Sequence, residues 1–358
     1  MLATNTTTPT ITESAETILS VKELAVAFQS DEGDWLTAVD NVSFDLKKGS
    51  VLGLVGESGC GKSVTSYAIM RLLPQPQSKI LRGEIWLKTN TSSSEPLVED
   101  QGINLVSYPQ KLLHKIRGRR IAMIFQDSMS ALNPVHKIGK QIAEVYRLHF
   151  PEMSPSEVRK SMLELLHQVQ MPDPEQKMDA FPHQLSGGMR QRVMIAMALA
   201  CQPDILIADE PTTALDVTVQ AQILNLIYEL KEQTSMSILL ITHDFGVIAQ
   251  MCDEVVVMYA GRVAEQGPVN TIIDQPQHPY TKGLLSSIPS LADQPKTMLP
   301  TIEGYVPGLK SMPEGCRFVN RCSEAKERCS TSPPLTQVGD NHNVACHLVT
   351  PNQNNSQG

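Results

Sequence analysis

The chain has 358 residues, enough for one large domain or two modest ones with a buried core. Its composition is globular, with 41% hydrophobic and 19% charged residues, and its net charge of −8 argues against a nucleic-acid-binding surface. Apolar runs stay short of the roughly 20 residues of a membrane span. Residues 1–20 are rich in Thr and Ser and do not resemble a signal peptide. We expect a disordered leader on a cytoplasmic protein.

The first regular elements are two strand-like stretches. Residues 21–29 and 36–46 are separated by a turn-forming segment at 30–34. They predict an antiparallel β arm ahead of the main core.

A strand, a glycine-rich turn and a helix follow at 51–73. The turn consists of Gly56, Glu57, Ser58, Gly59, Cys60, Gly61, Lys62 and Ser63. Its glycines let successive N–H groups surround phosphate oxygens, and the helix dipole adds positive charge. Lys62 is expected to reach the β- and γ-phosphates, and Ser63 to bind Mg²⁺. The turn predicts a nucleotide site, the alternative being a glycine-rich turn that binds nothing.

Cys60 occupies a variable position of this loop. Backbone N–H groups and the neighbouring Lys62 are expected to lower the pKa of its thiol. We hypothesise that alkylation of Cys60 inactivates the protein and that a bound nucleotide protects it. The interpretation that a variable position favours is a small residue that only fills space, and the acidified thiol is the hypothesis set beside it.

The middle of the chain changes from β to helical pattern. Residues 83–87 form a short strand pattern, 88–104 a polar loop, and 111–120 a basic segment expected to be a solvated surface. An apolar strand at 121–125 precedes a helical region. Ser154 and Glu157, with a proline between them, predict a capped helix start. We expect a helical subdomain over about 127–190.

The second half returns to alternating strands and helices. Strand-like runs at 204–208, 237–241 and 254–258 predict a mostly parallel sheet covered on both faces. From 291 to 358 the chain becomes irregular and rich in Pro, Gly and Cys. The fold prediction is an α/β phosphate-loop NTPase core with an antiparallel β arm, an inserted helical subdomain and a separate C-terminal appendage.

Two acids end the strand at 204–208. Asp209 is expected to hold Mg²⁺ beside Ser63, and Glu210 to polarise the attacking water. The alternative is a strand-to-loop junction with solvated acids.

A Ser-Gly-Gly turn opens the helix predicted at 189–200, and it predicts a second anion site. Residues 185–192 resemble the signature of ABC-type ATPases. Gln126 matches the glutamine loop of that family, residues 213–216 match its D-loop, and His243 matches its switch histidine. The resemblance extends over about 21–290.

This resemblance implies a head-to-tail dimer. Its signature residues would face the γ-phosphate that the partner's loop holds; they are Ser186, Gly187, Gly188 and Gln191. It implies catalytic roles for Glu210, His243 and Gln126, with Gln126 also near Mg²⁺, and a D-loop role for Asp216. The adenine needs an aromatic platform, for which Phe28 is the first choice and Trp35 the alternative.

Four cysteines lie near the C-terminus: Cys316, Cys322, Cys329 and Cys346. Their spacing is compatible with a [4Fe–4S] cluster, a zinc site or unliganded thiols. The segments around them, and residues 128–134 and 278–281, resemble the di- and oligopeptide importers. That resemblance implies a [4Fe–4S] cluster on all four cysteines, with Zn²⁺ as the alternative.

The functional prediction is an ATPase subunit, peripheral on the cytoplasmic face of the cell (inner) membrane, that energises import of short peptides. Its implied partners are two permease subunits, a second ATPase subunit (this chain or a homologue) and a substrate-binding protein, without nucleic acid. Nickel, haem precursors and antimicrobial peptides are alternative solutes. A soluble ABC-type ATPase acting on ribosomes or DNA is a further alternative. The tail could also act as a redox or iron sensor.

Overall fold

The computed structural model describes residues 16–88, 102–127, 131–213, 215–288 and 300–351. Most of the predicted leader, most of the polar loop at 88–104, and residues 128–130 and 291–299 lie outside the described residues. Among the helices that are described, none combines the length and the apolar character that a membrane crossing requires.

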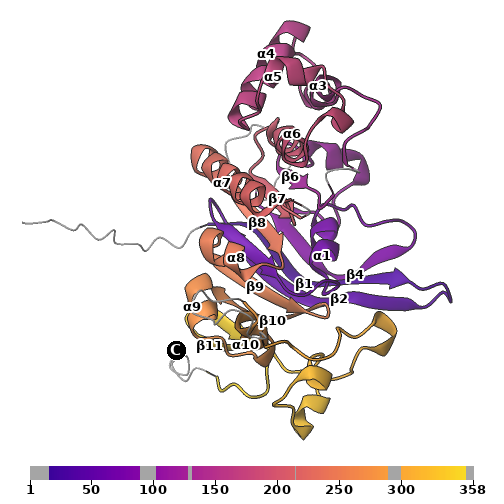
Figure 1. Ribbon diagram of the computed structural model, residues 1–358. Helices are drawn as coiled ribbons and strands as arrows, with labels where there is room; N and C mark the ends of the chain where they lie inside the picture. Colours follow the sequence, from indigo (N-terminus) through magenta and orange to yellow (C-terminus); the bar gives the residue numbers. More distant parts are fainter. Residues whose placement is uncertain (1–15, 89–101, 128–130, 214, 289–299, 352–358) are drawn as a thin grey trace, which may run out of the picture.

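An eight-stranded sheet forms the core, and five consecutive strands, which run to its edge at β6, are parallel (Figure 1). In spatial order these are β9 (Glu254–Tyr259), β3 (Val51–Val55), β8 (Ser237–Thr242), β7 (Ile205–Asp209) and β6 (Ile121–Ile124). Residues of β3 alternate between two cores: Val51 and Val55 join one, and Leu52 and Leu54 the other. Both faces are buried, as predicted for a parallel sheet covered on each side. The central position of β3 puts the glycine-rich turn at the middle of the sheet edge.

The antiparallel arm is a second sheet with strand order β2-β1-β4-β5. Its strands are β1 (Thr17–Gln29), β2 (Trp35–Lys47), β4 (Ser78–Leu87) and β5 (Ile103–Asn104). β1 begins at Thr17, inside the predicted leader, and β4 is longer than the strand predicted at 83–87. Both differences have one cause: β1 lies between β2 and β4, and pairing on both edges extends regular structure beyond the local pattern. The arm shares a core with β3 and α1 (Lys62–Ile69).

The helical subdomain lies at the top of Figure 1. It contains α3 (Ile138–His149), α4 (Pro155–Gln168) and α5 (Pro174–Met178), and α6 (Gly187–Leu199) leads back to the sheet. The predicted cap of α4 is confirmed, because Ser154 Oγ accepts from the Glu157 N–H and a Glu157 carboxylate oxygen accepts from the Ser154 N–H at 2.7 Å. Short 3₁₀ turns lie at Gln110–Lys115 and Pro182–Gln184.

The basic segment at 111–120 is only partly a solvated surface. Arg117 donates to the carbonyl oxygens of Met70 and Arg71, and Arg120 pairs with Asp204. These side chains join the segment to the end of α1 and to the start of β7. The prediction of a merely solvated face was wrong for them, because sequence position does not reveal which basic side chains meet buried carbonyls.

The remaining helices are α7 (Val217–Thr234), α8 (Phe245–Met251), α9 (Val269–Asp274) and α10 (Pro279–Ser286). The C-terminal residues do not form a detached unit. Their strands β11 (Thr336–Gly339) and β12 (His342–Val344) extend the main sheet beyond β10 (Arg262–Pro268), where Glu265 pairs with Val344. Three 3₁₀ turns, Leu309–Ser311, Val319–Arg321 and Glu327–Ser330, precede the hairpin.

Candidate functional site

The glycine-rich turn runs from the end of β3 to the start of α1. Gly56, Gly59 and Gly61 have φ angles of 154°, 79° and 103°, which favour glycine. A Cβ on Gly56 would lie 2.2 Å from the backbone oxygen of Met258 in the adjacent strand β9. The loop can therefore curl tightly against the sheet edge only with glycine at this position.

Lys62 lies inside this loop. Its Nζ donates to the carbonyl oxygens of Gly56 at 2.7 Å and Glu57 at 3.1 Å, and the side chain is buried. The loop thus closes around a cation at the N-terminus of α1. This is the geometry of an anion site, in which phosphate oxygens can meet the ammonium and the helix N–H groups together.

Ser63 and Asp209 meet at the mouth of the loop. Ser63 Oγ donates to Asp209 Oδ1 at 3.1 Å, and Asp209 Oδ2 is buried with no hydrogen-bond partner among the described residues. Burial raises the pKa of Asp209 to about 6, although the hydrogen bond from Ser63 acts in the opposite direction. A hydroxyl beside an unpartnered carboxylate oxygen is an all-oxygen ligand set of the type that Mg²⁺ prefers. These residues therefore fit the predicted Mg²⁺ site.

Two of the predicted catalytic residues, Gln126 and His243, lie against the carboxylate of the third, Glu210. Glu210 Oε2 accepts from Gln126 Nε2 at 2.9 Å and from Thr213 Oγ1 at 2.9 Å, and His243 Nδ1 lies 3.4 Å from Oε1. Glu210 has a φ of 47°, a backbone conformation that a non-glycine residue rarely adopts and that is typical of functional sites. The sequence placed Thr213 in a motif but did not identify its contact with Glu210.

The signature turn lies at the start of α6. Ser186 caps the helix by accepting from the Met189 N–H at 3.3 Å. A Cβ on Gly188 would lie 2.8 Å from a methyl of Val219 in α7, so the turn packs closely against that helix. Asp216 caps α7 by accepting from the Val219 N–H at 2.9 Å. The signature turn and the D-loop segment are thus held together as one surface.

Leu215 and Gln191 lie beside the signature turn. Leu215 lies 3.2 Å from the position of a Cβ on Gly187. Gln191 is buried, and its Nε2 has no partner among the described residues. These contacts place the predicted signature residues without testing their role toward a second subunit.

The two candidate aromatic platforms differ in their surroundings. Trp35 is 38% exposed, and Lys79 Nζ lies 3.8 Å from the centroid of its ring. Phe28 is half-buried at the end of β1 and packs on the core beneath the arm. Because Lys79 covers one face of Trp35, Phe28 remains our first choice.

The hypothesis of an acidified Cys60 thiol was wrong, and the space-filling interpretation agrees with the structure. Its side chain is fully buried, and burial raises the pKa of the thiol although Lys62 acts in the opposite direction. The sequence showed the positive charge but not the loss of solvent. A buried neutral thiol is a poor nucleophile, so Cys60 fills space under the loop.

The C-terminal residues reach the phosphate loop, which the sequence did not predict. Arg321 donates from both terminal nitrogens to the Glu57 carboxylate, at 2.6 and 3.0 Å. Tyr280 Oη accepts from the Glu57 N–H at 2.8 Å, and Phe318 packs against Tyr280 and Tyr259. The segments at 278–281 and 321–322 carried a family resemblance, but their contact with the loop depends on tertiary packing.

The four C-terminal cysteines are free thiols near one another. Burial raises the pKa of Cys316, Cys322 and Cys346, and the other thiols of the set add to that effect. Across the described residues, no three or more His, Cys, Asp or Glu side chains are arranged to hold a metal ion. As they lie, the cysteines do not form the predicted metal site.

Comparison with known proteins agrees with this geometry. Residues 39–213 match the family model described as ABC transporter. Dipeptide transport ATP-binding protein DppD of Bacillus subtilis (strain 168) is 49% identical over 334 residues, covering 93% of this chain and 95% of its own length. The chain therefore belongs to the ABC transporter family of ATP-hydrolysing proteins.

Within that family, residues 264–329 match the model described as oligopeptide/dipeptide transporter, C-terminal region. Oligopeptide transport ATP-binding protein OppD of Escherichia coli (strain K12) is 45% identical over 340 residues, covering 95% of this chain and 96% of its own. The dimeric structure of MJ0796, a bacterial ABC transporter cassette, superposes with a TM-score of 0.59 at 28% identity, over 70% of this chain and 98% of that one.

Proposed function

We propose that this chain is the ATP-hydrolysing subunit that energises import of di- and oligopeptides through partner permeases. The observation that carries the proposal is the joining of two features in one structure. The first is a phosphate loop after β3 whose Ser63 bonds Asp209 at the end of β7, with Glu210 as the next residue. The second is a C-terminal region of the peptide-transporter type that holds that loop through Arg321.

Hydrolysis requires positioning and charge stabilisation more than covalent chemistry. Lys62 and the N–H groups of the loop bind the phosphates. Ser63 and Asp209 would hold Mg²⁺, which would supply positive charge beside the phosphates. Glu210 orients and polarises the attacking water. Gln126 and Thr213 fix the direction of the Glu210 carboxylate through the two hydrogen bonds to its Oε2.

The second half of each site belongs to another subunit in our proposal. The γ-phosphate held by Lys62 of one subunit is bound from the other subunit by Ser186, Gly187, Gly188 and Gln191. The subunit that supplies Lys62 also supplies the His243 that contacts this phosphate. Asp216 lies where two subunits meet. The fold likeness to a cassette described as dimeric supports this arrangement.

The same proposal assigns the protein to the cytoplasmic face of the cell membrane as a peripheral subunit. Its partners are two permease subunits, a second ATPase subunit (this chain or a homologue) and a substrate-binding protein. The names of the relatives DppD and OppD, which describe dipeptide and oligopeptide transport, support peptides as the solute. Uptake assays with nickel or a haem precursor in place of peptide test the alternative solutes.

A metal centre on Cys316, Cys322, Cys329 and Cys346 is also part of the proposal, with [4Fe–4S] first and Zn²⁺ as the alternative. Its support is the proximity of four free thiols. Iron, sulfide and zinc analysis of anaerobically purified protein, with Cys329→Ser as control, tests it; metal-free protein that does not take up either metal contradicts it.

Glu210→Gln tests the ATPase role. The variant keeps the shape of the side chain, so we expect unchanged ATP binding and a loss of hydrolysis by a factor of about 10²–10⁴. Glu232→Gln is the matched control, since Glu232 is exposed on α7 and should leave the rate unchanged. In vesicles that contain the partner permeases, peptide uptake should stop with hydrolysis. Steady hydrolysis by Glu210→Gln would refute the assigned role.

A further inference from the structure

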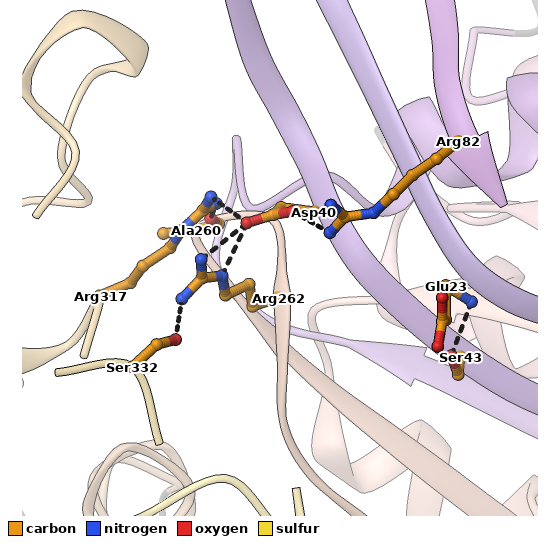
Figure 2. Close-up of polar contacts among 8 residues, drawn as sticks. All are labelled: Glu23, Asp40, Ser43, Arg82, Ala260, Arg262, Arg317 and Ser332. Atoms are coloured by element: carbon orange, nitrogen blue, oxygen red, sulfur yellow. Dashed lines mark hydrogen bonds and ion pairs between the residues drawn. The ribbon is translucent and has the colours of Figure 1, made fainter. Parts of the chain in front are cut away.

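One cavity of the protein is lined by residues outside the phosphate loop. It has a volume of about 450 Å³ and lies where β2, β10 and the C-terminal residues meet. Figure 2 shows the polar side chains on its wall, with Arg82, Arg262 and Arg317 turned toward Asp40. The mechanism of ATP hydrolysis uses none of these residues.

The cavity has an excess of positive charge. Asp40 Oδ1 accepts from Arg82 at 2.9 Å, and Oδ2 accepts from Arg262 at 2.7 and 3.0 Å and from Arg317 at 3.1 Å. Asp40 is the single acid among the described residues that line the cavity. Three guanidinium groups against one carboxylate leave a net charge of about +2.

The positive charge is poorly compensated where it is most deeply buried. The side chain of Arg317 is 8% exposed, and its Nε has no hydrogen-bond partner among the described residues. A buried cation without full pairing is costly, and a bound anion reduces that cost.

Another part of the cavity lining is apolar. It is formed by Tyr259, Val263, Phe318, Pro333 and Leu335. The volume lies within the range of about 300–1,000 Å³ that is usual for small-molecule pockets. Guanidinium groups are planar donors that match the geometry of a carboxylate. An occupant with a carboxylate and an apolar body can pair with the arginines and pack on the apolar side chains.

We propose that this cavity binds a small organic carboxylate with an apolar side chain, and that its occupant influences the phosphate loop. This proposal does not depend on the identity of the transported solute. The carboxylate pairs with Arg82 and Arg262 from the open side, while its apolar part lies on Phe318 and Leu335.

A short series of hydrogen bonds connects the cavity to the phosphate loop. Arg317 donates to the carbonyl oxygen of Ala260, in the tight turn between β9 and β10. The next residue, Gly261, donates its N–H to the Cys60 carbonyl at 2.8 Å and accepts from the Asp40 N–H at 2.8 Å. Ala260 and Gly261 have φ angles of 45° and 81°, so this turn is conformationally restricted. An anion that competes with Asp40 for the arginines therefore acts on a turn that contacts the loop.

Binding to the full-length protein is measured by calorimetry with three probes: N-acetylphenylalanine, its amide, and inorganic phosphate. We expect the carboxylate to bind at least about tenfold more tightly than the amide, which lacks the charge, and than phosphate, which lacks the apolar body. Equal binding of carboxylate and amide, or tighter binding of phosphate, overturns the proposal.

Substitutions of the lining residues test whether the probe binds in this cavity. Arg82→Ala should weaken binding of N-acetylphenylalanine by a factor of about three to ten, and Arg159→Ala, on the exposed face of α4, is its matched control. Leu335→Glu places a competing carboxylate at the mouth and should weaken binding about tenfold relative to Leu335→Gln. Leu335 is 43% exposed, so both changes are compatible with folding. Unchanged affinity in Arg82→Ala and Leu335→Glu contradicts the site.

The influence on the loop is tested separately. Because coupling between two sites is reciprocal, saturating N-acetylphenylalanine should change ATP affinity by the same factor by which ATP changes affinity for the probe. We expect a change of at least about threefold in wild type and none in Leu335→Glu. Binding without any change in ATP affinity refutes the coupling.

Discussion

Replacing Arg321 by alanine should loosen the phosphate loop from outside the nucleotide site. Arg321 holds the Glu57 carboxylate through two short hydrogen bonds, and its side chain is 5% exposed against 29% for Glu57. It also donates to the carbonyl oxygens of Ile302 and Glu303. One side chain thus joins the second residue of the loop to the C-terminal region.

The magnitude follows from these contacts. Hydrogen bonds to charged groups contribute about 1.5–3 kcal/mol each, and breaking a buried ion pair costs about 3–5 kcal/mol. Because Glu57 retains contact with solvent, we expect Arg321→Ala to lower the free energy of unfolding by about 2–4 kcal/mol. The KM for ATP should rise about five- to tenfold while kcat changes little, since the loop binds phosphate but Glu210 orients the water.

The assay combines urea unfolding with steady-state kinetics in a double-mutant cycle of Arg321→Ala and Glu57→Gln. We expect a coupling energy of at least about 1 kcal/mol between the two sites. Lys137→Ala is the control, because its ion pair with Asp179 is 50% and 75% exposed and should contribute less than about 1 kcal/mol. A coupling energy near zero together with an unchanged KM would refute this account of Arg321.

Three further outcomes are expected. Cys60 should resist N-ethylmaleimide in the folded protein, because its thiol is buried and its pKa raised; peptide mapping that finds it labelled as fast as in unfolded chain contradicts this. Gly56→Ala should destabilise the fold by about 2–4 kcal/mol and weaken ATP binding, because its Cβ would meet a backbone oxygen of β9, whereas Gly59→Ala, with open space around it, should cost about 1 kcal/mol. Burial lowers the pKa of His278 to about 4, so as the pH falls His278 is protonated in the unfolded chain before it is protonated in the folded protein. The free energy of unfolding should therefore drop by about 2 kcal/mol between about pH 7 and pH 5. The drop should be smaller in His278→Asn, measured by urea unfolding, and an equal drop would show that His278 is not its source.

Local chemistry made much of the nucleotide site readable from the chain. The glycines of the loop, Lys62 and Ser63 carry their function in their spacing, because phosphate binding uses backbone N–H groups over a few consecutive residues. The end of a strand can also be predicted from the sequence. Asp209 and Glu210 were therefore predicted at the same sheet edge as the loop, and the structure has them there. The cap of α4 at Ser154 depends on residues three apart and was predicted for the same reason.

Contacts between distant segments were not readable in this way. The burial of Cys60, the ion pair of Arg321 with Glu57, and the addition of β12 to the main sheet join residues far apart in sequence. Each depends on which surfaces the packed sheets bring together. No local pattern in the sequence predicts these contacts. The sequence alone determined the chemistry of phosphate binding, since that chemistry lies in neighbouring residues. Only the tertiary structure decided what supports the loop and which thiol is protected from solvent, because burial and long-range charge pairing arise when the core closes.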